Sequence, residues 1–331
     1  MKRSHYEEYL SSQFRLEVHT SNGEDIVDGI LHRLDVGSQV LISGGIPRFV
    51  VGQVYAGNFG LQWNAFRSTQ LDSSTNLPLT FNRFWNNTRW KPKDLFGKTI
   101  LEIGSGAGRF TEILLEAGAR VVSFDLTSAT DANWKNNKDK GDLFLFQGDL
   151  YTIPLPKEYF DYVFCYGVLQ HTPDPNLAYK NIFSKLKPGG QISIDYYRSF
   201  KWPNVWATPK YIWRPITKRM DIYKLLSVIR TYIPLWLPVD SMLRRIPYFG
   251  PRLLAIVPIP CWNYLHLGLT RALRKEWLIM DTFDALAAYY DYPKTISEVQ
   301  EMIDSVENGE SEVFYGSNGI VANILKSNHY K

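Results

Sequence analysis

The chain has few cysteines and no long apolar run. Two of its 331 residues are cysteine, Cys165 and Cys261, and they provide no disulfide framework. The most apolar run, residues 253–260, is interrupted by Pro258 and Pro260. It is far shorter than the roughly 20 residues that a membrane-spanning helix needs. The first residues also lack the apolar core of a secretory signal, so we expect a cytoplasmic protein without a membrane span.

Acidic residues are scarce in one segment. Between Lys201 and Lys275 there are thirteen Lys or Arg, and the acids are Asp221 and Asp240, so the local formal charge is +11 against +4 for the whole chain. The same segment holds five of the ten Trp and nine of the 18 Pro. This composition suits an anionic membrane surface, a phosphorylated substrate or nucleic acid. A helical lid whose aromatic side chains pack on a sheet edge explains it equally well.

Glycines are concentrated directly after a predicted strand. Residues 98–108 are a β-branched segment that continues into Gly104, Gly106 and Gly108. Glycine has no Cβ and tolerates positive φ, so a ligand can approach this backbone closely, and we expect a side chain at Gly104 or Gly106 to fill the ligand's space. A dinucleotide-binding fingerprint would have its third glycine at position 109, which is Arg109. The segment predicts a nucleotide-binding loop, and an ordinary Gly-rich turn is the alternative.

Acids end the next two predicted strands. One ends at Asp125, about twenty residues beyond the glycines, where a carboxylate can accept both ribose hydroxyls. The next ends at Asp149. Asp174 and Pro175 then begin a helix as N-cap and first helical residue. The predicted strands after the glycine loop are 120–125, 143–149, 160–167 and 191–197. Strands that alternate with helices in this way predict a parallel, doubly wound α/β sheet.

The pattern from Glu102 through the three glycines to Asp125 resembles the class I S-adenosylmethionine-dependent methyltransferase family. The resemblance implies a methyltransferase with a Rossmann-like, seven-stranded sheet whose last two strands form an antiparallel hairpin, here 311–317 and 320–326. It implies S-adenosyl-L-methionine as the cofactor, with Asp149 bonded to the adenine amino group. The expected cofactor-binding residues are Glu102, Gly104, Ser105, Gly106, Gly108, Asp125, Leu126, Gly148, Asp149, Leu150, Tyr166, Gly167 and Arg83.

The resemblance also divides the chain. Residues 44–50, 55–64 and 69–73 resemble the lead-in of a bacterial methyltransferase subgroup that carries a zinc-ribbon-like segment. Paired cysteines hold zinc in full versions of that segment, but no cysteine precedes Cys165 here, and His32 with Asp35 is no four-ligand set. We therefore expect a degenerate ribbon that serves as a small β cap, and no metal site. The expected units are 1–75 as the ribbon-like segment, 76–200 with 277–331 as the catalytic domain, and 201–276 as a helical lid.

Two residues are candidates for chemistry. Residues 79–85 predict a helix across the cofactor mouth, and Arg83 on it matches the methionine carboxylate of the cofactor in a bidentate way. His171 follows the fourth strand of the sheet, and imidazole ordinarily titrates near pH 6.5, so His171 is the candidate base for a hydroxyl acceptor. A surface arginine and a histidine that only shapes its loop are the alternatives.

The acceptor is not defined by the sequence. The subgroup is often associated with surface polysaccharide biosynthesis, which favours O-methylation of a sugar or glycan intermediate, and a lipid-linked glycan would also explain the basic segment. The alternatives are a lipid-soluble quinone or polyketide acceptor and a non-catalytic cofactor-binding module. No recognised RNA-binding module is present, so we do not expect a nucleic-acid substrate. Contact with an anionic membrane, the oligomeric state and the acceptor atom stay open.

Overall fold

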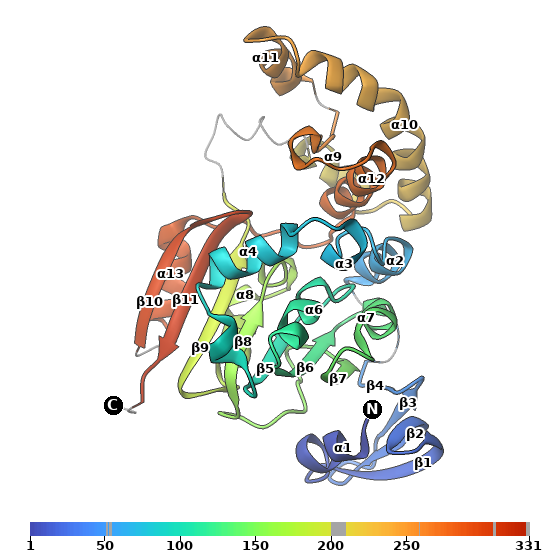
Figure 1. The fold of residues 1–331 in the computed structure, drawn as a ribbon, viewed down its shortest axis with the longest axis vertical. Coiled ribbons are helices and arrows are strands. Elements are labelled where there is room, and N and C mark those ends of the chain that lie inside the picture. The colour runs from blue at the N-terminus through green and yellow to red at the C-terminus, as the bar shows by residue number, and fades with distance from the viewer. Residues whose placement is uncertain (51, 53–54, 200–209, 258, 307–308, 329–331) are drawn as a thin grey trace.

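The computed structural model describes residues 1–50, 52, 55–199, 210–257, 259–306 and 309–328. A single 11-stranded sheet runs through it in the order β1-β2-β3-β4-β7-β6-β5-β8-β9-β11-β10 (Figure 1). We expected seven strands. The last seven strands of this order form that block, and the four N-terminal strands extend it at one edge.

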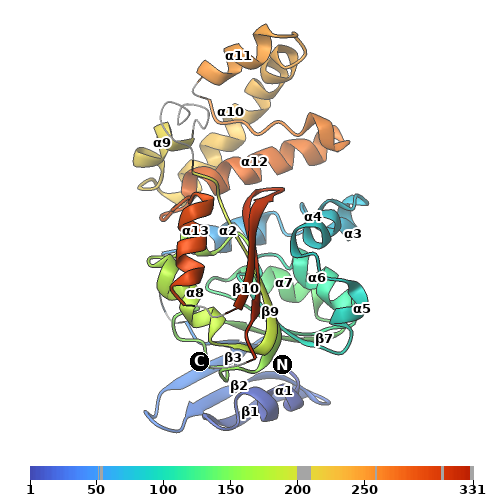
Figure 2. The same ribbon diagram turned by 90° about the vertical axis from the view of Figure 1, so that its left-hand side faces the viewer.

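The centre of the sheet is parallel. Its strands are β5 (Thr99–Ile103), β6 (Arg120–Asp125), β7 (Asp142–Gln147), β8 (Phe160–Cys165) and β9 (Leu186–Tyr196). Helices α5 (Pro92–Leu95), α6 (Arg109–Glu116) and α7 (Ala129–Asn137) lie on one face, and α8 (Pro175–Phe183) lies on the other (Figure 2). Every residue of β5 is buried because both faces are covered. The carboxyl ends of these strands meet at one edge, where open α/β sheets bind ligands.

The C-terminal segment completes the sheet. Helix α13 (Ile296–Asp304) begins at a capping box in which Thr295 and Glu298 satisfy each other's backbone N–H groups. Strands β10 (Gly309–Gly316) and β11 (Gly319–Lys326) then form an antiparallel hairpin, and β11 pairs antiparallel with β9. The turn of this hairpin therefore reaches the same edge as the carboxyl ends of the parallel strands.

The N-terminal segment is an antiparallel meander. Helix α1 (Arg3–Tyr9) precedes β1 (Phe14–Asn22), β2 (Asp25–Arg33), β3 (Gln39–Ser43) and β4 (Ile46–Arg48). We expected a separate β cap, but Arg48 pairs in parallel with Gln147 of β7, and the Phe49 N–H donates to the Gln147 carbonyl at 2.8 Å. The meander thus continues the central sheet, which explains the four additional strands. Its likeness to a zinc ribbon stays a prediction.

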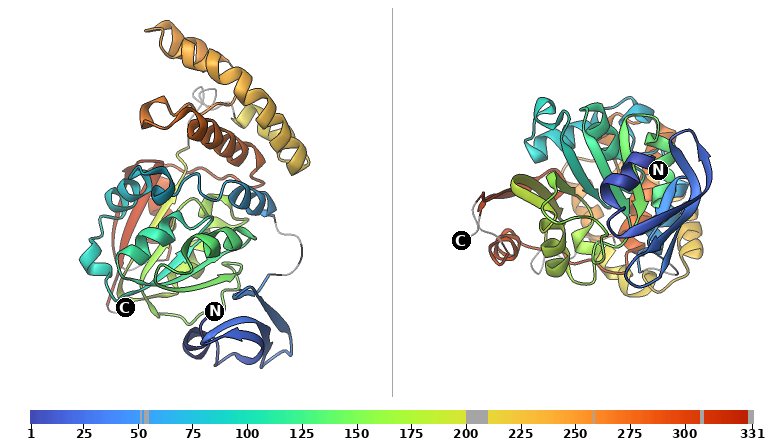
Figure 3. Two further views of the ribbon diagram at one scale, coloured as in Figure 1. Left: turned by 45° about the vertical axis from the view of Figure 1, so that its right-hand side comes forward. Right: turned by 90° about the horizontal axis from the view of Figure 1, so that it is seen from below.

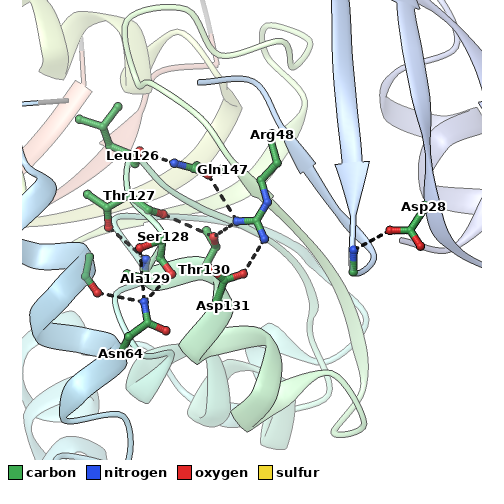
Figure 4. Close-up of polar contacts among 12 residues, drawn as sticks. Asp28, Arg48, Asn64, Leu126, Thr127, Ser128, Ala129, Thr130, Asp131 and Gln147 are labelled. Atoms are coloured by element: carbon green, nitrogen blue, oxygen red, sulfur yellow. Dashed lines mark hydrogen bonds and ion pairs between the residues drawn. The ribbon is translucent and has the colours of Figure 1, made fainter. Parts of the chain in front are cut away.

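The side chain of Arg48 fastens this junction (Figure 4). It donates to Thr130 Oγ1 at 3.0 Å, to Gln147 Oε1 at 3.3 Å and to Asp131 Oδ1 at 2.5 Å. Gln147 in turn donates to the Leu126 carbonyl at 3.1 Å. Arg48 and Gln147 therefore connect the meander by hydrogen bonds to the segment that follows β6. That segment contains Leu126, one of the predicted cofactor contacts.

A helical body covers the carboxyl edge of the sheet. It consists of α9 (Lys210–Thr217), α10 (Ile222–Leu243), α11 (Phe249–Ile256), the short η3 (Leu265–Leu267) and α12 (Arg271–Ala287). It has its own hydrophobic core, in which Ile229 and Ile233 of α10 and Phe283 of α12 are fully buried. The body and the N-terminal meander lie at opposite ends of the molecule (Figure 3).

The helical body does not end where we placed the boundary. Helix α12 is continuous from Arg271 to Ala287, so the predicted division at 276/277 falls inside it. Residues 201–209 of the predicted lid lie outside the described residues. Of the helices that the structure describes, none is both long and apolar enough to span a bilayer.

Candidate active site

A cavity of about 800 Å³ lies between the carboxyl edge of the sheet and the helical body. Its walls come from the glycine loop, the ends of β6 to β9, helices α2 (Gly57–Ala65), α4 (Leu79–Thr88) and α12, and the turn between β10 and β11. Residues of the helical body, among them Lys210, Trp262 and Tyr264, complete it. The volume falls within the range of ligand pockets.

The glycine loop has the backbone that only glycine adopts readily. Gly104, Gly106 and Gly108 have φ of 68°, 53° and 85°, and the first two line the cavity. A Cβ at Gly104 would lie 2.1 Å from Val168 Cγ2, and one at Gly106 would lie 3.0 Å from the Trp63 ring. We expected such a side chain to fill ligand space. The ligand contact stays a prediction, and a Cβ would also displace Val168 and Trp63, so these glycines let two neighbouring elements approach the loop.

Gly108 does not line the cavity. A Cβ there would lie 2.1 Å from Asn133 Oδ1 and 2.2 Å from Asn137 Nδ2, both on α7. Asn137 donates to the Gly108 carbonyl at 2.8 Å. Gly108 therefore permits close packing of α7 against the loop, which replaces the direct ligand contact that we expected of it.

Glu102 also lies outside the cavity lining. Its Oε2 accepts hydrogen bonds from Thr111 Oγ1 at 2.5 Å and from Ser123 Oγ at 2.8 Å, in the interior between β5, β6 and α6. Both partners are protein groups that fix the helix after the glycine loop, and the direct cofactor contact that we expected of Glu102 stays a prediction. Burial raises the pKa of the Glu102 carboxyl to about 7.

This pKa predicts a pH-dependent stability. A carboxyl whose pKa is raised on folding stabilises the fold fully below about pH 4.5, and the contribution is lost as pH rises through about 7. We expect Glu102→Gln to remove up to about 3 kcal/mol of the fall in unfolding free energy between pH 5 and pH 8. Urea unfolding across this range measures it, with Glu310→Gln, an exposed acid, as the control. An unchanged pH profile in Glu102→Gln contradicts the prediction.

Two carboxylates stand at the ends of neighbouring strands and line the cavity. Asp125 accepts from the Gly106 N–H at 3.0 Å and from the N–H and Oγ1 of Thr127 at 2.9 and 2.7 Å. Burial raises the pKa of Asp125. Asp149 accepts from the Tyr151 N–H at 2.9 Å. Leu126, Gly148 and Leu150 lie beside them in the cavity wall.

Arg83 is at the cavity, but a protein carboxylate already holds it. Its Nη2 donates to Asp195 Oδ2 at 2.8 Å, and Asp195 Oδ1 accepts from the Gly167 N–H at 2.5 Å. The guanidinium also lies over the rings of Phe110 and Tyr166. Its Nε is buried and has no hydrogen-bond partner among the described residues. We did not predict Asp195 as its partner, because the two residues are 112 positions apart.

His171 lies in a short 3₁₀ turn, η1 (Leu169–His171), and lines the cavity. Its Nδ1 is 2.9 Å from the Tyr290 carbonyl oxygen. Because a carbonyl only accepts, we assign the proton to Nδ1, which leaves the lone pair of Nε2 available. The rings of Phe59 and Tyr197 pack against the imidazole, each with centroids 5.3 Å away. The arrangement fixes the orientation of the imidazole, with Nδ1 held by the carbonyl.

The cavity wall to which α12 contributes, here called the far wall, carries a polar cluster that we did not predict from the sequence. Asp281 on α12 accepts from Tyr264 Oη, from Trp277 Nε1 at 3.1 Å and from Gln70 Nε2 at 3.3 Å. Burial raises the pKa of the Asp281 carboxyl to about 7. Trp277 lies one turn before Asp281 on α12, but Gln70 is 211 positions away, so the sequence gives no signal for that contact.

A second pair continues this cluster one helical turn along α12. Asp284 accepts from Gln62 Nε2 at 3.2 Å, and both residues line the cavity. Gln62 Oε1 is buried with no hydrogen-bond partner in the described part of the chain. The far wall therefore presents carboxylate and amide groups to whatever fills the cavity.

Comparison with known proteins identifies the central segment. Residues 101–194, from β5 to β9, match the family model described as a methyltransferase domain. The chain is 32% identical over 110 residues to the ubiquinone biosynthesis O-methyltransferase of Coxiella burnetii. The aligned segment covers 32% of this chain and 47% of that protein. It is 29% identical over 131 residues to the tRNA U34 carboxymethyltransferase of Nautilia profundicola, covering 36% of this chain and 44% of that protein.

The chain thus spans about half the length of the curated relatives that it matches. A solved S-adenosylmethionine-dependent methyltransferase from Aquifex aeolicus is similar over 46% of this chain and 77% of that chain, with 17% identity and a TM-score of 0.33. The similarity to a methyltransferase domain is carried by residues 101–194, the segment from β5 to β9.

Proposed function

We propose that this chain transfers a methyl group from S-adenosylmethionine to a hydroxyl of a sugar or glycan intermediate. The observation that carries the proposal is His171, whose Nδ1 is held by the Tyr290 carbonyl so that Nε2 is available in the cavity. A base with this orientation serves an acceptor that must lose a proton, and a hydroxyl is such an acceptor.

The residues present fit the cofactor. Asp125 and Asp149 would hold the ribose and the adenine amino group, as their positions at adjacent strand ends allow. Ser105 Oγ and Arg83 Nε are both buried without a partner among the described residues, and both residues line the cavity. Such unpaired groups cost free energy unless a ligand satisfies them, and the carboxylate of the cofactor matches the Arg83 guanidinium. When bound, the cofactor supplies a methyl group already activated on a sulfonium.

Residues of this chain accept the proton and hold the base in position. Nε2 of His171 would accept the proton that the acceptor hydroxyl loses on methylation. The resulting imidazolium keeps its Nδ1–H bond to the Tyr290 carbonyl, which stabilises the positive charge. Phe59 and Tyr197 prevent rotation of the ring by packing against it. The helical body encloses the cavity and so limits the water that competes for the same groups.

The polar far wall favours a polyhydroxyl acceptor. Asp281, Asp284 and Gln62 present hydrogen-bonding groups, and Gln62 Oε1 has no partner in the described structure. An apolar acceptor would leave such groups without water or partner, which is costly. Trp262 and Trp277 add flat apolar faces to the same wall. Hydroxyl groups together with a ring face satisfy both features.

A lipid-soluble phenol of quinone type is the second candidate acceptor. The name of the Coxiella relative, ubiquinone biosynthesis O-methyltransferase, supports it. Such a phenol requires the same base and the same cofactor site as a sugar acceptor. The two acceptors differ in the contacts that they would make with the far wall. A non-catalytic cofactor-binding module is the third reading, and it predicts binding without turnover.

Labelled methyl transfer distinguishes these readings. The protein is incubated with methyl-labelled S-adenosylmethionine and fractionated extracts of the source cell, and we expect the label in a glycan fraction. Label in a lipid-soluble phenol supports the second candidate, and label in RNA or protein contradicts both. Calorimetry with the unlabelled cofactor accompanies the assay. One binding site per chain without any labelled product supports the non-catalytic module, and absence of binding overturns the whole proposal.

A further inference from the structure

Helix α10 carries two apolar stripes, and only one of them is buried. Leu225, Ile229 and Ile233 belong to the stripe that packs in the core of the helical body. The exposed residues Val228, Leu235, Val239 and Met242 recur at intervals of seven, four and three, which places them on one side of the helix. The side chain of Leu235 is 74% exposed.

The exposed stripe continues into the turn at the end of α10. Tyr248 and Phe249 are 81% and 75% exposed, and Ile246 and Leu253 beside them are also exposed. Figures 1 and 2 show α10 and α11 at the end of the molecule farthest from the N-terminal meander. Single exposed apolar residues are normal, but a stripe that ends in two protruding aromatic residues marks an interaction surface.

The charge of this surface has one sign. Within the described residues 210–257 the exposed basic side chains are Arg219, Lys224, Arg230, Arg244, Arg245 and Arg252. Two acids lie in the same stretch: Asp221, exposed at the start of α10, and Asp240, which is 2% exposed and ion-paired with Arg244. A partner that covers the stripe must therefore tolerate or supply negative charge.

We propose that the exposed faces of α10 and α11 dock on an anionic phospholipid surface, with Leu235, Phe249 and their apolar neighbours in the interface and with Lys224, Arg245 and Arg252 at the headgroups. An apolar stripe bordered by Lys and Arg is the arrangement by which helices lie on membranes. A second copy of the chain would bring two like-charged surfaces together, which is unfavourable.

Vesicle co-sedimentation of the full chain tests this. We expect binding to vesicles of phosphatidylcholine with one-third phosphatidylglycerol to be at least about tenfold stronger than binding to phosphatidylcholine alone, and to weaken in high salt. The double variants Leu235→Ser/Phe249→Ser and Arg245→Glu/Arg252→Glu should each lower binding by about tenfold or more. Because these side chains are exposed, thermal melts should stay those of the wild type.

The same assay is applied to matched control variants, and it can also give results that contradict the proposal. Leu34→Ser, at an exposed apolar residue of the meander, and Lys91→Glu/Lys93→Glu, near the opposite end of the molecule, should leave binding unchanged. Equal binding to both vesicle types, or no binding, overturns the proposal. So does light scattering that shows a dimer which Leu235→Ser/Phe249→Ser converts to a monomer. The assay needs no cofactor, so its failure is distinct from a failure of the proposed methyl transfer.

Discussion

His171→Ala should lower methyl transfer to a hydroxyl acceptor by about 10²–10⁴-fold, the usual contribution of a general base. The reason is geometric. The Tyr290 carbonyl fixes the proton on Nδ1, and two aromatic rings hold the imidazole in the cavity wall. Alanine removes the acceptor nitrogen, whereas the glycine loop, Asp125 and Asp149 stay in place. Affinity for S-adenosylmethionine should therefore change little, because none of these cofactor contacts involves His171.

The measurement has two parts. Initial rates with labelled cofactor and the acceptor fraction give turnover, and calorimetry gives cofactor affinity for the same preparation. His19→Ala is the matched control, since His19 is exposed on β1 in the meander. Undiminished turnover in His171→Ala would show that His171 is not the base and that it only shapes its loop. A parallel loss of cofactor affinity would show instead that the variant disturbs the pocket as a whole.

The sequence predicted the central sheet because local patterns decide it. β-branched runs, the glycine loop and acids at strand ends mark β5, β6 and β7, and the structure contains all three within one or two residues of the predicted bounds. The N-terminal strands were also expected as β structure. Their junction with β7 was not predicted, because it depends on Arg48 reaching Thr130, Asp131 and Gln147, which lie some 80 to 100 positions away.

The candidate site shows the same limit more sharply. Asp125, Asp149 and His171 follow strands and could be placed at the carboxyl edge from the sequence alone. Val168 against Gly104 and Trp63 against Gly106 could not, because these contacts require the packing of separate elements. The same is true of Asp281, whose partners Gln70 and Tyr264 come from segments before and after the central sheet. The spacing between Glu102 and the glycines likewise carries no information on where the Glu102 side chain points.

Asp125→Ala should weaken binding of S-adenosylmethionine and of its demethylated product by about 10²-fold or more. Hydrogen bonds to a charged group contribute roughly 1.5–3 kcal/mol each, and we expect the Asp125 carboxylate to accept from two ribose hydroxyls. The carboxylate also receives the N–H groups of Gly106 and Thr127, so its removal loosens the loop that frames the cofactor. Calorimetry with both ligands measures the change, and a thermal melt shows whether the fold is intact.

Asp125→Asn separates the two contributions. Its amide oxygen can still accept from the Thr127 N–H, but the amide nitrogen faces the Gly106 N–H or the ribose as a donor, where an acceptor is required. We therefore expect an affinity between those of the wild type and Asp125→Ala. Asp28→Ala, which changes an acid on β2 in the meander, should bind as the wild type does. If Asp125→Ala retains full affinity for both ligands while its melting temperature falls, Asp125 acts only in holding the loop, and the ribose contact must come from another residue of the cavity wall.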